Sequence, residues 1–149
     1  MSAEKYILPD RAAWLDARKN HIGGSDAAAC VGRSPHKDNV QLWEEKMGLV
    51  LPEDISDKEY VRYGTEAEKY LRGLFALDFP EYQVLYDENN MFLNPDFPWM
   101  HASLDGELMD RQGRHGILEI KTTNILQSSQ RRNWEGRIPD NYYCQVLHY

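Results

Sequence analysis

The hydrophobic pattern of this chain changes period twice, and that change limits the folds open to it. Residues 57–78 carry Tyr60, Tyr63, Leu74 and other apolar side chains at helical spacing. Residues 82–122 fall into short strand-like runs, and from residue 124 the pattern is helical again. Shorter helices are predicted at 11–19, 26–31, 40–47 and from 140 onward. This order predicts an α+β, or α/β-like, fold with a mixed central sheet flanked by helices.

Within this pattern we predict local details that the structure can test. Asp10 and Ser25 are expected to cap the helices at 11–19 and 26–31. Residues 82–87 and 91–93 are expected to pair as a hairpin-like turn, and residues 99–104 to pair with 107–109. Residues 116–122 form a further predicted strand.

Length, charge and composition narrow the class of protein. The 149 residues fit a single domain, 1–149, and two cysteines exclude a disulfide framework or a four-cysteine metal site. No run approaches the roughly 18 apolar residues of a membrane helix, and the first residues contain no apolar signal core, so we expect a cytoplasmic protein with no membrane partner. The net charge of −7 resides in residues 44–88, so a cationic surface elsewhere remains compatible with a phosphate-bearing substrate.

One constellation of polar residues points to chemistry. Asp105-Gly106 is followed, after a turn, by the strand-like run Leu118-Glu119-Ile120-Lys121. Side chains alternate across a strand, so Glu119 and Lys121 share one face, and a hairpin through residues 111–115 would bring Asp105 beside Glu119. Two carboxylates and an ammonium then converge, as metal-dependent phosphodiester hydrolysis requires. The alternative interpretation, without catalytic chemistry, is an aspartate in a turn next to an exposed Glu–Lys pair on an edge strand.

Other blocks of the sequence give this motif a context. In order along the chain, these blocks are Trp14-Leu15 to Arg18, Ile22-Gly23-Gly24-Ser25-Asp26-Ala27-Ala28, Leu42-Trp43-Glu44-Glu45-Lys46-Met47-Gly48, Gly64-Thr65-Glu66-Ala67-Glu68, Ala102-Ser103-Leu104-Asp105-Gly106, Leu118-Glu119-Ile120-Lys121-Thr122-Thr123, and Ile138-Pro139 to Tyr142-Tyr143-Cys144-Gln145-Val146. Through these blocks the chain resembles, from about residue 11 to the end, the YqaJ-like viral recombinases, relatives of the phage lambda exonuclease within the PD-(D/E)xK nuclease superfamily.

The resemblance implies a restriction-endonuclease-like core and a metal centre. Asp105 and Glu119 resemble the carboxylate ligands of Mg²⁺, for which Mn²⁺ is expected to substitute, and the Ile120 carbonyl resembles a backbone ligand. Lys121 resembles the catalytic lysine, and Glu68 the helix glutamate that approaches the metal through water. Glu66, two residues from Glu68, is expected to be a solvated surface acid.

The resemblance also implies a pocket for a terminal 5′-phosphate. Its members would be Arg18, Ser25, Ser103 and Gln145, joined by Arg33. Independently of the resemblance, Tyr142 is an aromatic candidate for stacking on DNA, and its alternative is a core or interface position. Arginine supplies forked donors that match phosphate oxygens. The alternatives are an ordinary helix cap at Ser25 and a solvated cation in the last turn of a helix at Arg18.

These features favour a Mg²⁺-dependent nuclease that digests duplex DNA from a 5′ end for phage-type recombination. The resemblance further implies a homo-trimer and a single-strand annealing partner. Two alternatives remain: an endonuclease, structure-specific or nicking, on the same core, and a non-catalytic DNA-binding or assembly module. Because family domains usually continue into further strands past the Gln145 helix, residues 1–149 are expected to represent either a fragment or a naturally shortened form of the family domain.

Overall fold

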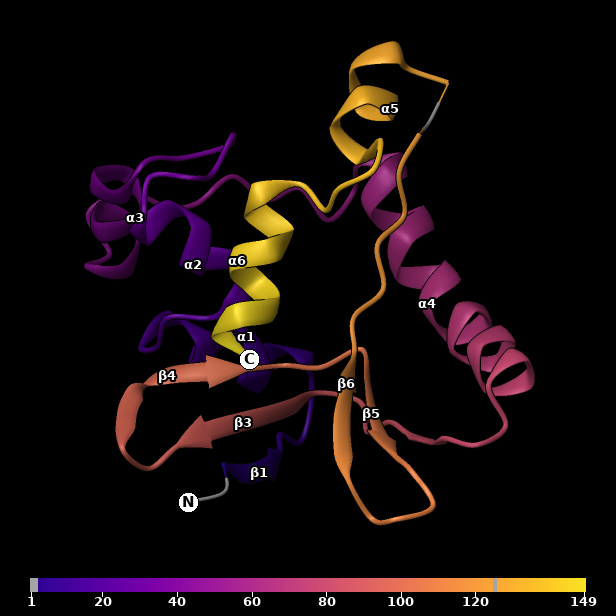
Figure 1. Cartoon of the computed structure of the whole chain (residues 1–149). Coiled ribbons are helices and arrows are strands. Elements are labelled where there is room, and N and C mark those ends of the chain that lie inside the picture. The colour runs from indigo at the N-terminus through magenta and orange to yellow at the C-terminus, as the bar shows by residue number, and fades with distance from the viewer. Residues whose placement is uncertain (1–2, 125) are drawn as a thin grey trace. The chain divides into compact units, whose positions relative to one another are not determined.

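The computed structural model describes residues 3–124 and 126–149, and the chain divides into two compact units (Figure 1). Unit 1 comprises Met1–Pro52, Asn89–Ser103 and Thr123–Tyr149, and unit 2 comprises Glu53–Glu88 and Leu104–Thr122. Both units combine helices with antiparallel strands, which confirms the predicted α+β class. Each unit contains all the residues of one of the two predicted sites.

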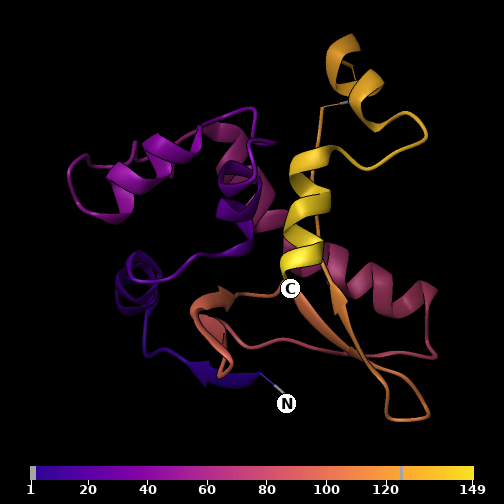
Figure 2. The same ribbon diagram turned by 60° about the vertical axis from the view of Figure 1, so that its left-hand side comes forward.

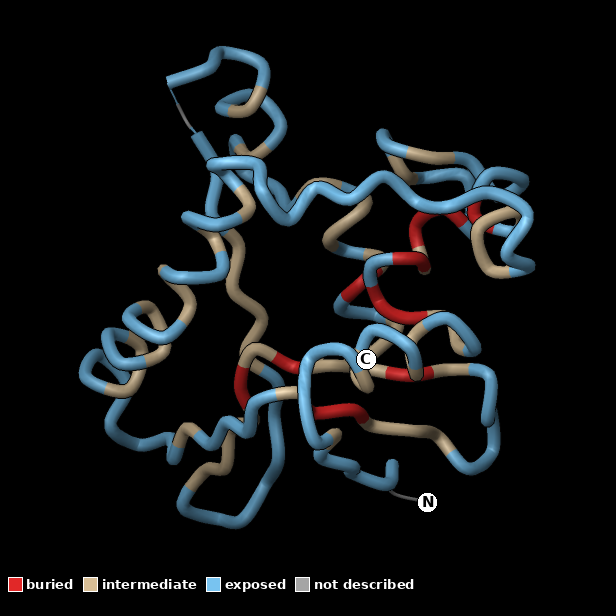
Figure 3. Tube along the Cα trace, turned by 180° about the vertical axis from the view of Figure 1, so that it is seen from behind, coloured by how far each residue is buried: buried red, intermediate tan, exposed pale blue. Residues whose placement is uncertain are grey.

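Unit 1 has a sheet in the order β1-β3-β4, and every pairing in it is antiparallel. Its strands are β1 (Glu4–Ile7), β3 (Asn90–Asn94) and β4 (Phe97–Ala102), and its helices are α1 (Arg11–Lys19), α2 (Gly24–Cys30), α3 (Asn39–Lys46), α5 (Ser128–Trp134) and α6 (Asp140–His148). The helix α6, yellow in Figure 2, packs against α2. Figure 3 shows the buried stretches in red, and the buried apolar residues of this unit include Ala28, Ala29 and Met91.

Unit 2 has a second antiparallel sheet in the order β2-β5-β6. Its strands are β2 (Gln83–Leu85), β5 (Gly106–Met109) and β6 (His115–Leu118), and its long helix is α4 (Glu59–Asp78). The helix α4 continues through Gly64 without a break, as the hydrophobic spacing predicts. The predicted hairpin through residues 111–115 is confirmed, because β5 and β6 pair directly.

The grouping of the other strands differs from the sequence prediction. The strands β2 and β3 are not a hairpin pair, since β2 pairs with β5 and β3 pairs with β1 and β4. The strands β4 and β5 likewise lie in separate sheets, so the predicted pairing of 99–104 with 107–109 is wrong. Instead of one mixed sheet, the described residues form two antiparallel sheets, with one isolated parallel bridge between Ile22 and Met100.

Two helix starts test the predicted caps. Asp10 caps α1 as predicted, and its carboxylate accepts the Ala13 N–H at 2.8 Å. The prediction for Ser25 is wrong, because the N-cap of α2 is Gly23 and Ser25 is already inside the helix. The Asp26 carboxylate accepts the Gly23 N–H at 3.1 Å, and the Gly23 carbonyl accepts the Asp26 N–H at 2.9 Å, so the helix starts without a serine cap. The Ser25 hydroxyl is thereby left to bond another side chain.

The last predicted strand ends earlier than its sequence suggests. β6 stops at Leu118, whereas alternation in the sequence continues to residue 122. Its partner β5 begins at Gly106, opposite Leu118, so the ladder has no further backbone to pair with. The N–H of Ile120 is satisfied by the Asp105 carboxylate instead.

Candidate metal centre and candidate phosphate pocket

The β5–β6 hairpin of unit 2 brings the two predicted metal carboxylates to the same end of the sheet. Gly106 pairs with Leu118, and Asp105 and Glu119 are the next residues outward on each side. A Cβ on Gly106 would lie 3.2 Å from the Leu118 Cβ, which is closer than most side chains approach, so glycine fits this crossing without a shift of Leu118. The sequence prediction that the hairpin would place Asp105 beside Glu119 therefore agrees with the register.

Asp105 is fixed through its carboxylate and through its backbone. Its Oδ2 accepts the Ile120 N–H at 2.7 Å, which spans the hairpin end. Its carbonyl oxygen accepts a hydrogen bond from the Arg72 guanidinium of α4 at 3.0 Å. The position of this carboxylate is thus set by both the hairpin and the long helix.

Glu119 and Lys121 form an ion pair on one side of the chain, as their spacing predicts. The side chain of Glu119 is 10% exposed and that of Lys121 is 25% exposed, so the pair is largely shielded from water. Burial and the charge of Asp105 raise the pKa of Glu119, although Lys121 opposes the shift. The single positive charge of Lys121 does not balance the negative charges of Asp105 and Glu119.

Glu68 of α4 belongs to the same electrostatic cluster. Burial and the charges of Asp105 and Glu119 raise its pKa to about 7, while Arg72 and Lys121 act in the opposite direction. Burial also raises the pKa of Asp105, although the Ile120 N–H, Lys121 and Arg72 all lower it. The three carboxylates of Glu68, Asp105 and Glu119 outnumber the cations Lys121 and Arg72, so the fully ionised cluster carries an excess of negative charge.

The donor set of this cluster fits a hard divalent cation. Mg²⁺ prefers oxygen ligands and usually takes one or two carboxylates together with waters. Among the residues that the structure describes, no three His, Cys, Asp or Glu side chains are grouped as a ready set of metal ligands. Asp105, Glu119 and the Ile120 carbonyl supply oxygens of the required kind without such a set. Glu66 is outside the cluster: it is exposed and pairs with Lys69 at 3.7 Å.

In unit 1, three of the predicted phosphate-pocket residues are connected through Trp14. The Arg18 guanidinium donates to the Ser25 hydroxyl at 3.2 Å and lies 4.2 Å from the centre of the Trp14 ring. The Trp14 Nε1 in turn donates to the Ser103 hydroxyl at 3.1 Å. Burial lowers the pKa of Arg18 despite the nearby Asp26, which marks a guanidinium held partly out of water. Such a guanidinium is suited to bind an anion.

Gln145, the fourth predicted pocket residue, is buried on α6 against the start of α2. Its Nε2 donates to the Tyr149 hydroxyl at 2.7 Å. A Cβ on Gly24 would overlap the Tyr149 ring and would approach the Gln145 Cγ to 2.9 Å. Gly24 therefore allows α6 to lie close to the segment that carries Ser25.

The described partners of Arg33 and Tyr142 are different. Arg33 forms an exposed ion pair with Asp140 at 3.1 Å, and the Tyr142 ring stacks on Trp134 with centroids 5.3 Å apart. Arg33 thus has an acid as its neighbour, and one face of the Tyr142 ring is occupied. The assignment of Arg33 and Tyr142 to DNA contacts stays a prediction from the sequence.

Two cations that sequence reasoning missed support these sites. Lys46 of α3 bonds the Asp26 carboxylate at 2.8 Å and the carbonyls of Arg18 and His21 at 3.0 and 2.7 Å. Arg72 of α4 bonds Asp105, as described above. The one available signal for Arg72 was its position one helical turn after Glu68. Lys46 gave no comparable local signal, because its partners lie 20 to 28 residues away.

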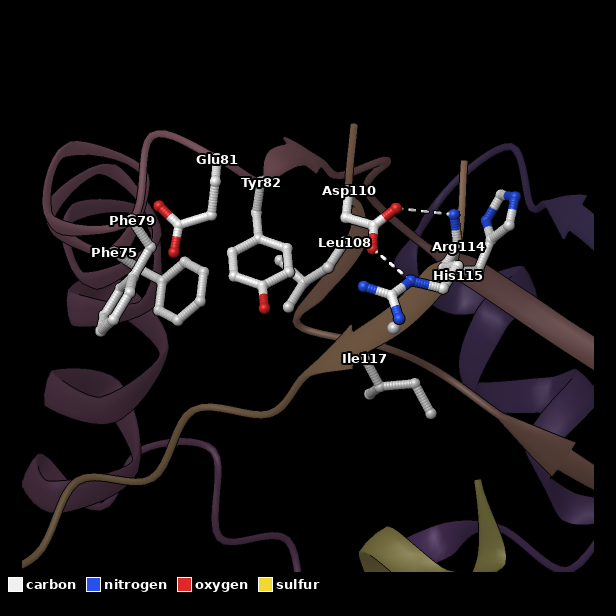
Figure 4. Close-up of a pocket in the computed structure, with 10 residues that line it drawn as sticks. Phe75, Phe79, Glu81, Tyr82, Leu108, Asp110, Arg114, His115 and Ile117 are labelled. Atoms are coloured by element: carbon white, nitrogen blue, oxygen red, sulfur yellow. Dashed lines mark hydrogen bonds and ion pairs between the residues drawn. The ribbon is translucent and has the colours of Figure 1, made fainter. Parts of the chain in front are cut away.

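A separate pocket of about 640 Å³ lies at the far end of the β5–β6 hairpin (Figure 4). Its wall is largely apolar, and the Asp110 carboxylate in it is bonded by Arg114. The remaining lining includes Phe75, Phe79, Glu81, Tyr82, Leu108, His115 and Ile117. None of the residues assigned above to the metal or the phosphate lines this pocket.

The class that the fold and the hairpin site define is an α+β protein with a carboxylate–lysine cluster. The chain belongs to the YqaJ-like viral recombinase family, since the model of the YqaJ-like viral recombinase domain matches residues 13–149. This confirms the resemblance seen in the sequence.

The chain is 30% identical over 140 residues to the uncharacterized protein YqaJ of Bacillus subtilis (strain 168). The aligned region covers 93% of this chain and 41% of that relative, so the chain spans about two-fifths of the relative's length. Within the described residues, no helix has both the length and the apolar character needed to span a bilayer.

Proposed function

We propose that this protein is a Mg²⁺-dependent deoxyribonuclease that digests duplex DNA from a 5′ end and serves phage-type recombination. The observation that carries the proposal is the convergence, within unit 2, of Asp105, Glu119 and Lys121 at one end of a hairpin. Family membership supports it, because the YqaJ-like domain is that of a viral recombinase.

In this proposal Asp105, Glu119 and the Ile120 carbonyl would hold the metal, and Glu68 would support the site from α4. A bound Mg²⁺ supplies Lewis-acid polarisation of the scissile phosphate. Asp105 keeps its orientation through the Ile120 N–H bond. The Lys121 ammonium, now paired with Glu119, orients the attacking water and stabilises the charge that develops on the phosphate.

The polarity of digestion is assigned to unit 1. Arg18, Ser25, Ser103 and Gln145 hold the terminal 5′-phosphate, and the fork of Arg18 matches two phosphate oxygens. The contacts that support this are the Arg18–Ser25 hydrogen bond and the Trp14 link to Ser103. Duplex DNA ends are the substrate, and a homo-trimer and a single-strand annealing protein are the partners that the family implies.

The deciding experiment is digestion of an end-labelled linear duplex with Mg²⁺, with and without a 5′-phosphate. We expect release of mononucleotides from the 5′ end and a strong preference for the phosphorylated end. Lys121→Ala should lower the rate about 100-fold or more, whereas Lys69→Ala on the exposed face of α4 should not change it. A Lys121→Ala protein that digests DNA at the wild-type rate contradicts the catalytic assignment.

The phosphate pocket has its own matched pair of variants. Arg18 and Arg11 both lie over the Trp14 ring, but Arg18 is the one whose guanidinium bonds Ser25. Arg18→Ala should therefore abolish the preference for phosphorylated ends, and Arg11→Ala should retain it. An unchanged preference in Arg18→Ala removes this residue from the pocket.

Two further assays separate the alternatives. Cleavage of closed circular DNA at a rate similar to linear DNA would identify an endonuclease. Calorimetry that detects no binding of Mg²⁺ or Mn²⁺ to the intact chain would identify a non-catalytic DNA-binding module.

A further inference from the structure

Arg72 links the long helix of unit 2 to the turn that carries Asp105. It lies one helical turn after Glu68 on α4, so both side chains extend from the same face of that helix. Its guanidinium donates to the Asp105 carbonyl oxygen at 3.0 Å. The segment before β5 is thereby attached to the helix that carries Glu68.

Tyr86 supports the same guanidinium from another side. The Arg72 Cζ lies 3.6 Å from the centre of the Tyr86 ring, a close cation–π contact. Tyr86 directly follows β2, which pairs with β5 through Val84 and Leu108. Arg72 is consequently held by one sheet at two places, through the residue before β5 and the residue after β2.

The two bonds to Asp105 act on different parts of that residue. The Ile120 N–H fixes its carboxylate, and Arg72 fixes its carbonyl. Together they determine the backbone of the turn and the direction of the carboxylate. Because Arg72 is on α4, the same contact sets the position of Asp105 relative to Glu68.

The charge of Arg72 adds to this geometric role. Its guanidinium opposes the upward pKa shifts of both Glu68 and Asp105, so it lies close to both acids. Arginine keeps its charge across the whole working pH range, and its planar fork can donate while its face rests on a ring. Lysine would supply the charge without the planar contact.

We propose that Arg72, held against Tyr86, is a positioning residue that sets the separation of Asp105 and Glu68 in the candidate metal centre. This inference rests on the proposed function and goes beyond it, because it assigns a role to Arg72 and Tyr86, which are not among the residues proposed above to bind metal or phosphate. The supporting groups around a metal site typically affect metal affinity by about 10- to 100-fold.

The experiment compares Arg72→Ala, Arg72→Lys and Tyr86→Leu with Arg62→Ala, an exposed arginine on the same helix. Binding of Mn²⁺ and Mg²⁺ to the intact chain is measured by calorimetry, and kcat and KM are measured on linear duplex DNA. We expect Arg72→Ala to weaken metal binding by about 10-fold or more and to lower kcat with KM for DNA unchanged. Arg72→Lys should recover part of the loss, and Arg62→Ala should match the wild type.

The outcomes distinguish the inference from the function on which it rests. A wild-type protein that neither binds metal nor cleaves DNA contradicts the proposed function. A wild type that does both, with Arg72→Ala and Tyr86→Leu indistinguishable from Arg62→Ala, overturns the role of Arg72. If Arg72→Ala fails to fold by circular dichroism, Tyr86→Leu decides: unchanged metal affinity in that variant overturns the inference, and a several-fold loss supports it.

Discussion

Asp26 in unit 1 and Asp105 in unit 2 are both partly shielded from water, but the pKa of Asp26 is lowered and the pKa of Asp105 is raised. Burial would raise the pKa of Asp26, yet the hydrogen bond and charge of Lys46, with the Gly23 N–H and Arg18, hold it below its usual range. Burial raises the pKa of Asp105, and the Ile120 N–H, Lys121 and Arg72 do not reverse that shift. The charge of Asp26 is balanced by neighbouring cations, so this ion pair stabilises the fold. Asp105 lies in a cluster whose acids outnumber its cations, and it is therefore suited to bind a further cation.

The largest effect is expected for Asp105→Asn, which tests the contrast between the two aspartates. The amide oxygen can still accept the Ile120 N–H, so the turn should persist while the ligand charge is lost. DNA hydrolysis should fall by about 1,000-fold, equivalent to about 4 kcal/mol of transition-state stabilisation. The rate on end-labelled duplex and the midpoint of urea unfolding are measured together, with Asp16→Asn in exposed α1 as the control. A large drop in the unfolding midpoint without loss of activity would reverse the roles that we assign to the two aspartates.

The next effect concerns stability and is predicted for Lys46→Met. Removal of the ammonium leaves Asp26 shielded without its cation, and the carbonyls of Arg18 and His21 lose a donor. Breaking a buried ion pair in this way costs about 3–5 kcal/mol, and the 22% exposure of the Lys46 side chain places our expectation near 3 kcal/mol. Urea denaturation measures it. A loss below about 1 kcal/mol would show that the pair is not structural.

Glu68→Gln should raise the free energy of unfolding at high pH, whereas Lys46→Met should lower it. The pKa of Glu68 is about 7 in the folded protein, against 4.5 for the free side chain, so folding favours its protonated form. The free energy of unfolding of the metal-free wild type should therefore fall as pH rises from about 4.5 to 7, and this fall should be smaller in the variant. At pH 8 in EDTA we expect Glu68→Gln to be more stable by on the order of 1 kcal/mol. Urea unfolding at pH 5 and pH 8 checks the sign, and added Mg²⁺ should remove the advantage.

The smallest effect is expected at an exposed ion pair. The side chains of Arg33 and Asp140 are 64% and 58% exposed, so water and salt screen their attraction. Arg33→Ala should change the free energy of unfolding by less than about 0.5 kcal/mol. Thermal or urea unfolding at low and high salt measures this. A loss comparable to that of Lys46→Met would mean that burial does not explain the difference between the two pairs.

The features predicted correctly from the sequence depend on residues that lie close together along the chain. The pair Asp105 and Glu119 was predictable because strand alternation and a short turn determine a hairpin, and the helix α4 was predictable from its spacing. The strand β1 was not predicted: it has four residues and pairs with β3, more than 80 residues away along the chain. Neither its length nor its composition identifies that partner.

The missed pairings and cations have a similar cause. The strands β2 and β3 are neighbours in the sequence, but they pair in different sheets. Hydrophobic periodicity predicts a strand but does not predict which other strand it pairs with. Lys46 and Arg72 bond backbone carbonyls, which any residue offers, and their side-chain partners Asp26 and Tyr86 are distant from them along the chain. Recognising their roles required the tertiary contacts.

The register of the β5–β6 hairpin also determines which changes of length this protein can tolerate. The turn between Asp110 and Arg114 is at the far end of the hairpin from Gly106 and Leu118, so extra residues there leave the pairing below unchanged. A single residue deleted within either strand would instead move every following side chain to the opposite face. Related proteins and engineered variants should therefore differ in the length of the turn while the distance in residues from each carboxylate to its strand stays the same.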